Sequence, residues 1–125
     1  MAEAKKRILL VEDESDFRLA VGMRLRAAGY EVLEADNGAA GLSMARSEMP
    51  DLIVLDLMLP KMDGYKVCRF LKFDEKYRHI PIIMLTARVQ LADSEMGSAV
   101  GADAYFTKPY QPQELIDTIA RLLAS

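Results

Sequence analysis

The sequence predicts a doubly wound α/β domain, in which a five-stranded parallel sheet is covered by helices on both faces. Two features predict this fold. The first is a set of short apolar runs rich in β-branched residues, and the second is their alternation with segments of helical period along the 125 residues. Runs of this length are typical of parallel strands buried on both faces. Five strand–helix units joined by right-handed crossovers give a sheet with helices on each side.

The predicted elements follow one another through short connections. Strands are expected over residues 8–11, 31–35, 51–56, 82–85 and 104–106, and helices over 14–28, 38–48, from 63–64 onward, 91–100 and 112–124. The chain shows no linker, low-complexity segment or repeat beyond this alternation. Residues 1–125 are therefore expected to form a single domain.

Stop signals and apolar spacing identify the helices. Gly29 ends the first helix, and Pro50 follows the second. Asp63-Gly64 opens the third, and Pro81 leads into the fourth strand. The side chains expected to face the core are Phe17, Val21, Leu25 and Ala28 in the first helix, Leu42 and Ala45 in the second, Val67, Phe70 and Leu71 in the third, and Leu115, Ile116, Ile119, Leu122 and Leu123 in the last.

Composition excludes several classes of protein. A net charge of -3 argues against direct binding to nucleic acid, which needs an excess of cations. No apolar run reaches membrane-spanning length, and the charged start of the chain lacks the apolar stretch of a signal peptide. The single cysteine, Cys68, cannot form an internal disulfide and is expected to pack in the core. We therefore expect a cytoplasmic protein without a membrane partner.

Five chemical groups stand at the ends of predicted strands. Glu12 and Asp13 follow the first strand, Asp56 closes the third, Thr86 follows the fourth and Lys108 follows the fifth. The carboxyl ends of parallel strands share one edge of the sheet, where open α/β sheets bind ligands. Each residue alone also has a structural interpretation, such as a helix N-cap at 13–16 or a Lys-Pro turn. Their convergence on one edge favours a functional site.

Three carboxylates, a hydroxyl and an ammonium suit a divalent cation together with a phosphoryl group. Mg²⁺, or Mn²⁺ in its place, takes oxygen ligands, which Asp13 and Asp56 can supply directly and Glu12 through a water. Carboxylates this close repel one another, and a bound cation relieves that repulsion. A carboxylate can then attack phosphorus to form an aspartyl phosphate. Lys108 can offset charge on the transferring group, and Thr86 can donate to its oxygens.

These residues lie in motifs with a specific order and spacing. Asp56 comes 43 residues after Asp13, Thr86 comes 30 after Asp56, and Lys108 comes 22 after Thr86. The motifs are Leu10-Val11-Glu12-Asp13-Glu14, Leu55-Asp56-Leu57-Met58-Leu59-Pro60 with Asp63-Gly64, Leu85-Thr86-Ala87, and Gly101-Ala102-Asp103-Ala104-Tyr105 through Lys108-Pro109. Over nearly its whole length the chain resembles the receiver domain of two-component response regulators. The resemblance implies a flavodoxin-like fold with strand order 2-1-3-4-5.

The resemblance also implies a role for each acidic residue. Asp56 would be the phosphoacceptor. Asp13 and Asp56 would bind Mg²⁺ together with the backbone carbonyl of Met58, and Glu12 would assist through water.

Further roles fall on the fourth and fifth strands. Thr86 and Ala87 would bind phosphoryl oxygens, and Lys108 would pair with them. Tyr105 matches the aromatic switch residue that turns inward when the threonine is drawn to the phosphate. The family usually holds the Lys108-Pro109 bond in the cis form.

The implied function is a phosphorylation switch. The phosphoryl group would come from a sensor histidine kinase or phosphotransfer protein, and the face formed by 91–100, 104–106 and 112–124 would control a downstream partner or effector domain. The domain would catalyse its own phosphorylation and dephosphorylation rather than act as an enzyme on other substrates. An aspartate-nucleophile phosphatase of the haloacid dehalogenase type needs a second aspartate where Met58 stands. A flavodoxin-like cofactor carrier needs a phosphate cradle where Glu12-Asp13-Glu14 would repel phosphate.

Two further expectations come from departures within the motifs. Met58 and Arg88 flank the expected phosphoryl site, and we expect them to slow its hydrolysis. Receivers that dimerise through the 91–124 face usually carry a second acid at position 104 and an arginine at position 118. Here these positions hold Ala104 and Thr118, so we expect a monomer or a weak, phosphorylation-dependent dimer.

Overall fold

The computed structural model describes residues 5–57, 59–86, 101–108 and 110–124. The strands are β1 (Arg7–Val11), β2 (Glu31–Ala35), β3 (Leu52–Asp56), β4 (Ile82–Thr86) and β5 (Ala104–Thr107). The helices are α1 (Ser15–Ala27), α2 (Gly38–Glu48), α3 (Gly64–Lys72) and α6 (Pro112–Ala124). The helix expected over 91–100 lies outside the described residues.

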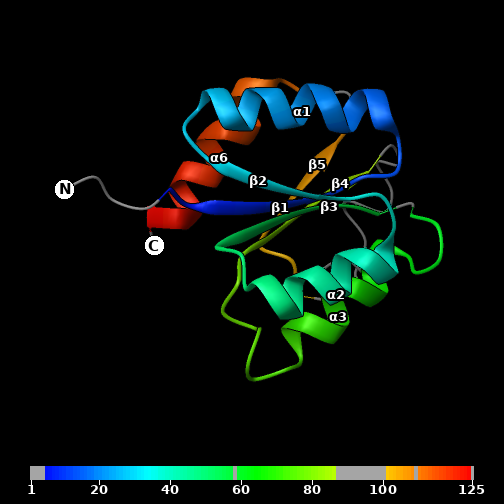
Figure 1. Cartoon of the computed structure of the whole chain (residues 1–125). Coiled ribbons are helices and arrows are strands. Elements are labelled where there is room, and N and C mark those ends of the chain that lie inside the picture. The colour runs from blue at the N-terminus through cyan, green and yellow to red at the C-terminus, as the bar shows by residue number, and fades with distance from the viewer. Residues whose placement is uncertain (1–4, 58, 87–100, 109, 125) are drawn as a thin grey trace.

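The strands form one sheet in the order β2-β1-β3-β4-β5, and all neighbouring strands are parallel. This arrangement confirms the predicted fold class and strand order. Helices α1 and α6 cover one face of the sheet, and α2 and α3 cover the other (Figure 1).

Alternate side chains of each strand enter the two layers of the core. In β1, Ile8 and Leu10 belong to the cluster under α1 and α6, whereas Leu9 and Val11 belong to the cluster under α2 and α3. Both clusters are fully buried at β1 and β3. The strand ends that carry the polar residues are therefore held in place from both sides of the sheet.

The helix ends agree closely with the sequence signals. Gly29 has a φ of 101°, a left-handed conformation that stops α1. Glu14 is the N-cap of α1 but makes no side-chain capping hydrogen bond. The capping interpretation of the acids at 13–16 therefore gains no support at this position.

The third helix differs from the expectation in one inward position. Phe70 is 49% exposed, whereas Cys68 is fully buried beside Val67 and Leu71. The helix has only nine residues, so its apolar positions fit two overlapping faces, and packing against the sheet selects the one that contains Cys68. In α6, Leu115 and Ile119 are buried, while Ile116, Leu122 and Leu123 are partly buried against the same cluster.

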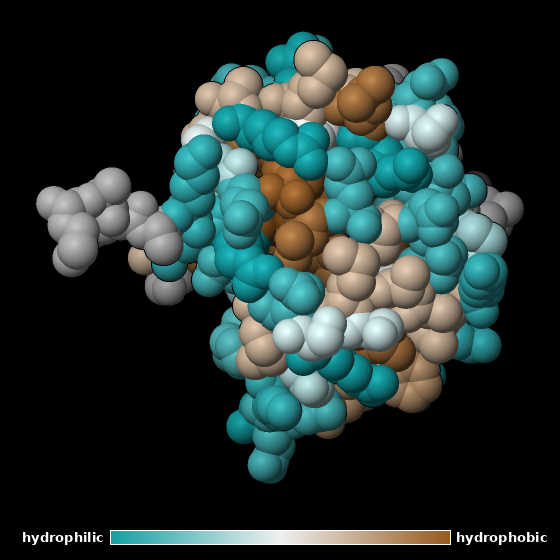
Figure 2. All heavy atoms as spheres, viewed as in Figure 1, coloured by the Kyte–Doolittle hydropathy of each residue, from teal (hydrophilic) through white to brown (hydrophobic). Residues whose placement is uncertain are grey.

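The edge strand β2 is lined by charged pairs. Glu31 accepts from Arg7 at 3.0 Å, and Glu34 accepts from Arg26 at 2.8 Å. Figure 2 shows a hydrophobic strip where β2 crosses this view, bordered by hydrophilic side chains. Charges along an edge strand discourage pairing with another chain.

In the described part of the chain, no helix is long and apolar enough to cross a bilayer.

Candidate functional site

The carboxyl ends of β1 and β3 bring the acidic residues together. Val11 lies beside Leu55 in the sheet, so Glu12 and Asp56 follow on adjacent strands. The amide of Glu12 donates to the carbonyl of Ala35 at 3.0 Å, which extends the strand pairing to the site. One carboxylate oxygen from each of Glu12, Asp13 and Asp56 lies within 4.8 Å of the others. The three carboxylates therefore converge as expected from the sequence.

The three carboxylates differ in their exposure to solvent. Glu12 and Asp56 are buried, at 1% and 5% exposed, whereas Asp13 is exposed. The cluster is therefore shielded from solvent at Glu12 and Asp56 and open to solvent at Asp13. Mg²⁺ binds through one or two carboxylates and keeps several waters, so this mixture of buried and exposed oxygens fits it. Met58, expected to add a backbone carbonyl, lies outside the described residues.

Lys108 reaches this cluster from the end of β5. Its Nζ donates to Glu12 Oε1 at 2.8 Å and to Asp56 Oδ2 at 3.2 Å. Burial lowers the pKa of Lys108, but the hydrogen bonds and charges of Glu12 and Asp56 outweigh that effect and raise it. The ammonium therefore stays charged and offsets part of the carboxylate repulsion.

Glu12 is the carboxylate of the cluster whose ionised form is disfavoured by its surroundings. Burial raises its pKa to about 7, and the nearby charge of Asp56 acts in the same direction. The hydrogen bonds from Lys108 and from the Glu14 amide oppose this rise. A bound cation would favour the ionised form of Glu12 in the same way as Lys108 does.

For some expected site residues, the structure does not describe the side chain or the whole residue. Thr86 ends β4 beside Thr107, but its side chain is not described. Ala87 and Pro109 lie outside the described residues, so the roles of Ala87 and the cis form of the Lys108-Pro109 bond remain predictions. Tyr105 is partly buried against the cluster under α2 and α3, and burial raises its pKa to about 12.

The structure adds two contacts that the sequence patterns did not indicate. The Lys108 Nζ lies 4.2 Å from the centroid of the Phe17 ring, a cation–π contact. Phe17 was expected only as a core residue of the first helix; its place one turn after Asp13 is the signal that could have linked it to the site. Arg18 donates to the backbone carbonyl of Glu12 at 2.8 Å and so ties the loop after β1 to α1.

Comparison with known proteins identifies a family. The model of the response regulator receiver domain matches residues 8–120. A relative in Porphyra purpurea named "Probable transcriptional regulator ycf27" is 45% identical over 123 residues, covering 98% of this chain and 49% of the relative. The DNA-binding dual master transcriptional regulator RpaA of Synechocystis is 44% identical over 117 residues, covering 94% of this chain and 48% of that protein. The chain spans about half the length of these relatives.

Solved structures agree with this match. The receiver domain of a sensor histidine kinase from Pseudomonas aeruginosa, solved with a magnesium ion coordinated in the active site cleft, has a TM-score of 0.89 and 34% identity, covering 98% of this chain and 100% of the other. The chemotaxis response regulator CheY4 of Vibrio cholerae has a TM-score of 0.87 and 32% identity, covering 95% and 99%.

Proposed function

We propose that this chain, which belongs to the response regulator receiver domain family, accepts a phosphoryl group on Asp56 from a sensor histidine kinase or phosphotransfer protein. One observation carries the proposal: Lys108 bridges Glu12 and Asp56, and Asp13 completes a carboxylate cluster beside them. A buried carboxylate with a fixed ammonium and cation ligands around it is suited to accept phosphorus.

The transfer exchanges one bond for another. A carboxylate oxygen of Asp56 attacks phosphorus, a P–O bond forms, and the P–N bond of phosphohistidine breaks with its electron pair returning to the imidazole. Lys108, 3.2 Å from Asp56 Oδ2, offsets charge on the phosphoryl oxygens. Asp13 and Asp56, with Glu12 nearby, would hold Mg²⁺, which would supply further charge neutralisation. Thr86 and Ala87 are proposed to bind the remaining oxygens.

We propose that phosphorylation is passed on to a partner by side-chain movement on β4 and β5. Thr86 and Tyr105 lie on neighbouring strands, since β4 and β5 pair directly. We propose that attraction of Thr86 to the phosphoryl group lets Tyr105 turn inward and alters the face that includes β5 and α6. A downstream protein or an effector domain would bind that face. The relatives named as transcriptional regulators are about twice as long as the matched region, which is consistent with such a domain.

Phosphorylation of the purified chain tests this function. Incubation with a small acyl-phosphate donor and Mg²⁺ should add one phosphoryl group that hydroxylamine removes, as measured by intact-protein mass spectrometry. Asp56→Asn should abolish the product, because an amide is a poor nucleophile. Asp36→Asn is the matched control, since Asp36 follows β2 at the same edge but lies outside the carboxylate cluster. Unchanged phosphorylation of Asp56→Asn would exclude Asp56 as the acceptor.

A further inference from the structure

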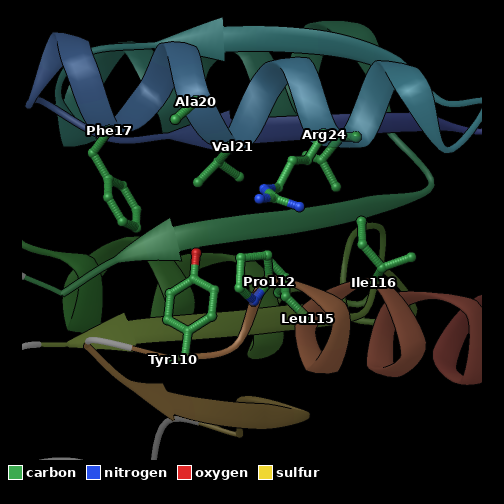
Figure 3. A pocket seen from close by; sticks show the side chains of 9 residues that line it. Phe17, Ala20, Val21, Arg24, Tyr110, Pro112, Leu115 and Ile116 are labelled. Atoms are coloured by element: carbon green, nitrogen blue, oxygen red, sulfur yellow. The ribbon is translucent and has the colours of Figure 1, made fainter.

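A small cavity lies between α1 and α6, on the face of the sheet that these helices cover (Figure 3). Its volume is about 150 Å³, and its walls are largely apolar side chains that include Val21, Leu25 and Leu115. A dry apolar cavity of about this size accepts a benzene ring in another protein. The space is therefore sufficient for one aromatic ring with small substituents.

Two polar groups face this cavity from different directions. The hydroxyl of Tyr110 is buried and has no hydrogen-bond partner among the described residues, and in Figure 3 it points toward α1. A buried hydroxyl without a partner is unfavourable, so an acceptor at this point would be stabilised. Arg24 also lines the cavity, and no carboxylate of the described chain forms an ion pair with it.

We propose that this cavity binds a small aromatic carboxylate, with the ring between α1 and α6, a neutral oxygen substituent at the Tyr110 hydroxyl and the carboxylate at Arg24. The orientation follows from charge. The Tyr110 ring contacts Phe17, Phe17 contacts Lys108, and Lys108 pairs with Glu12 and Asp56, so the Tyr110 end of the cavity is the end nearest the acidic cluster. An anionic group is favoured beside Arg24, whose position on α1 is about two turns after Phe17 and whose guanidinium lies near Val21 and Pro112 in Figure 3.

The cavity also adjoins the residue that bridges the acidic cluster. Phe17 lines the cavity, contacts the Tyr110 ring edge to face at 6.1 Å between centroids, and holds the Lys108 ammonium at 4.2 Å. A ligand that shifts Phe17 therefore shifts a contact of Lys108. Ligand binding does not depend on phosphorylation, whereas this link to Lys108 is relevant to activity only if the proposed function holds.

Titration of the unphosphorylated chain with three probes tests the site. We expect 4-hydroxybenzoate to shift amide signals of α1 and α6 in NMR spectra, with a dissociation constant of about 1 mM or tighter. Arg24→Gln should weaken 4-hydroxybenzoate and benzoate about tenfold and leave phenol unchanged. Tyr110→Phe should weaken 4-hydroxybenzoate several-fold and leave benzoate unchanged. Leu19→Ala, at a position on α1 that is 58% exposed and outside the cavity, should bind all three probes as the parent chain does.

Two results would overturn the proposal. The first is the absence of saturable shifts in α1 and α6 with any probe. The second is equal weakening of phenol and benzoate by Arg24→Gln, because the carboxylate would then not lie at Arg24. Both results concern binding alone, so they remain separate from any failure of Asp56 to accept a phosphoryl group.

Discussion

At the residue scale, Asp13 is the carboxylate of the cluster that can be removed with least effect on packing. It is exposed, unlike Glu12 and Asp56, so its replacement leaves the core intact. Its expected contribution is to hold the cation.

We expect Mg²⁺ to raise the melting temperature of the parent chain and to have much less effect on Asp13→Ala. A ligand that binds only the folded state stabilises it by about 2.7 kcal/mol at one hundred times its dissociation constant. Calorimetric titration with Mg²⁺ and thermal unfolding at several Mg²⁺ concentrations measure the effect, with Asp36→Asn as the control. Equal Mg²⁺ affinity in Asp13→Ala would mean that Asp13 is not a ligand.

Lys108 has a different role at the same scale, because it compensates buried charge when no metal is bound. Lys108→Met should lower the free energy of unfolding in the absence of Mg²⁺ by about 2 kcal/mol, since Glu12 and Asp56 would then face each other without a cation. Added Mg²⁺ should restore a larger share of stability in this variant than in the parent. Urea unfolding with and without Mg²⁺ measures both values, and an identical Mg²⁺ response would contradict this account.

Cys68 offers a prediction from protonation. Burial raises the pKa of its thiol from 9.0 to about 12. The thiolate is the reactive form, so the raised pKa lowers its fraction at pH 8 about a thousandfold relative to a thiol of ordinary pKa. A disulfide reagent should react slowly with the folded chain and rapidly after unfolding. Fast reaction in the folded state would show that α3 opens readily or that Cys68 is accessible.

At the element scale, the start of α3 determines where the end of β3 lies. A Cβ at Gly64 would meet the carbonyl oxygen of Asp56 and would lie 2.8 Å from the Cα of Leu57. Both atoms belong to the backbone, which cannot move aside without displacing Asp56. The close packing of this helix start is therefore part of how the site is built.

We expect Gly64→Ala to cost about 1–3 kcal/mol in the free energy of unfolding and to slow phosphorylation of Asp56. Gly22→Ala is the control, because the nearest atom to its Cβ would be the flexible end of Arg26 at 3.2 Å. That variant should remain within about 1 kcal/mol of the parent. Chemical unfolding and the acyl-phosphate reaction measure the two effects, and equal losses in both variants would contradict the proposed packing role.

Local pattern was sufficient to predict the helices and strands that the structure describes, but not all of their contacts. The first helix, for example, was expected over 14–28 and runs over Ser15–Ala27, because apolar spacing and Gly29 both act locally. The exposure of Phe70 depends on how a short helix packs on the sheet. The contact of Phe17 with Lys108 joins residues far apart in sequence. Such contacts arise from tertiary packing, which single-sequence periodicity does not contain.

At the scale of the whole molecule, some charged residues near β5 already form ion pairs and hydrogen bonds within the chain. Asp103 Oδ2 lies 2.8 Å from Lys72 Nζ and also accepts from the amide of Ile82. Lys72 donates further to the carbonyl of Ile80 at 2.7 Å. This network holds the end of α3 to the start of β4 and β5. Asp103, which directly precedes Ala104 of the expected dimer face, is therefore already paired inside its own chain.

We predict a monomer without phosphate and at most weak association with it. The expected dimer face has Ala104 and Thr118 where the family resemblance implies charged residues, and Asp103 is engaged by Lys72. Exposed ion pairs contribute only about 0–1 kcal/mol each, and several together are needed to fix how two chains align. A face with few such charges lacks that alignment. Light scattering with a phosphoryl mimic and Mg²⁺ measures the mass, and Thr118→Arg, which adds one expected cation, should strengthen any association. A tight dimer of the parent chain at micromolar concentration would contradict the prediction, since its stability would have to come from contacts other than these charges.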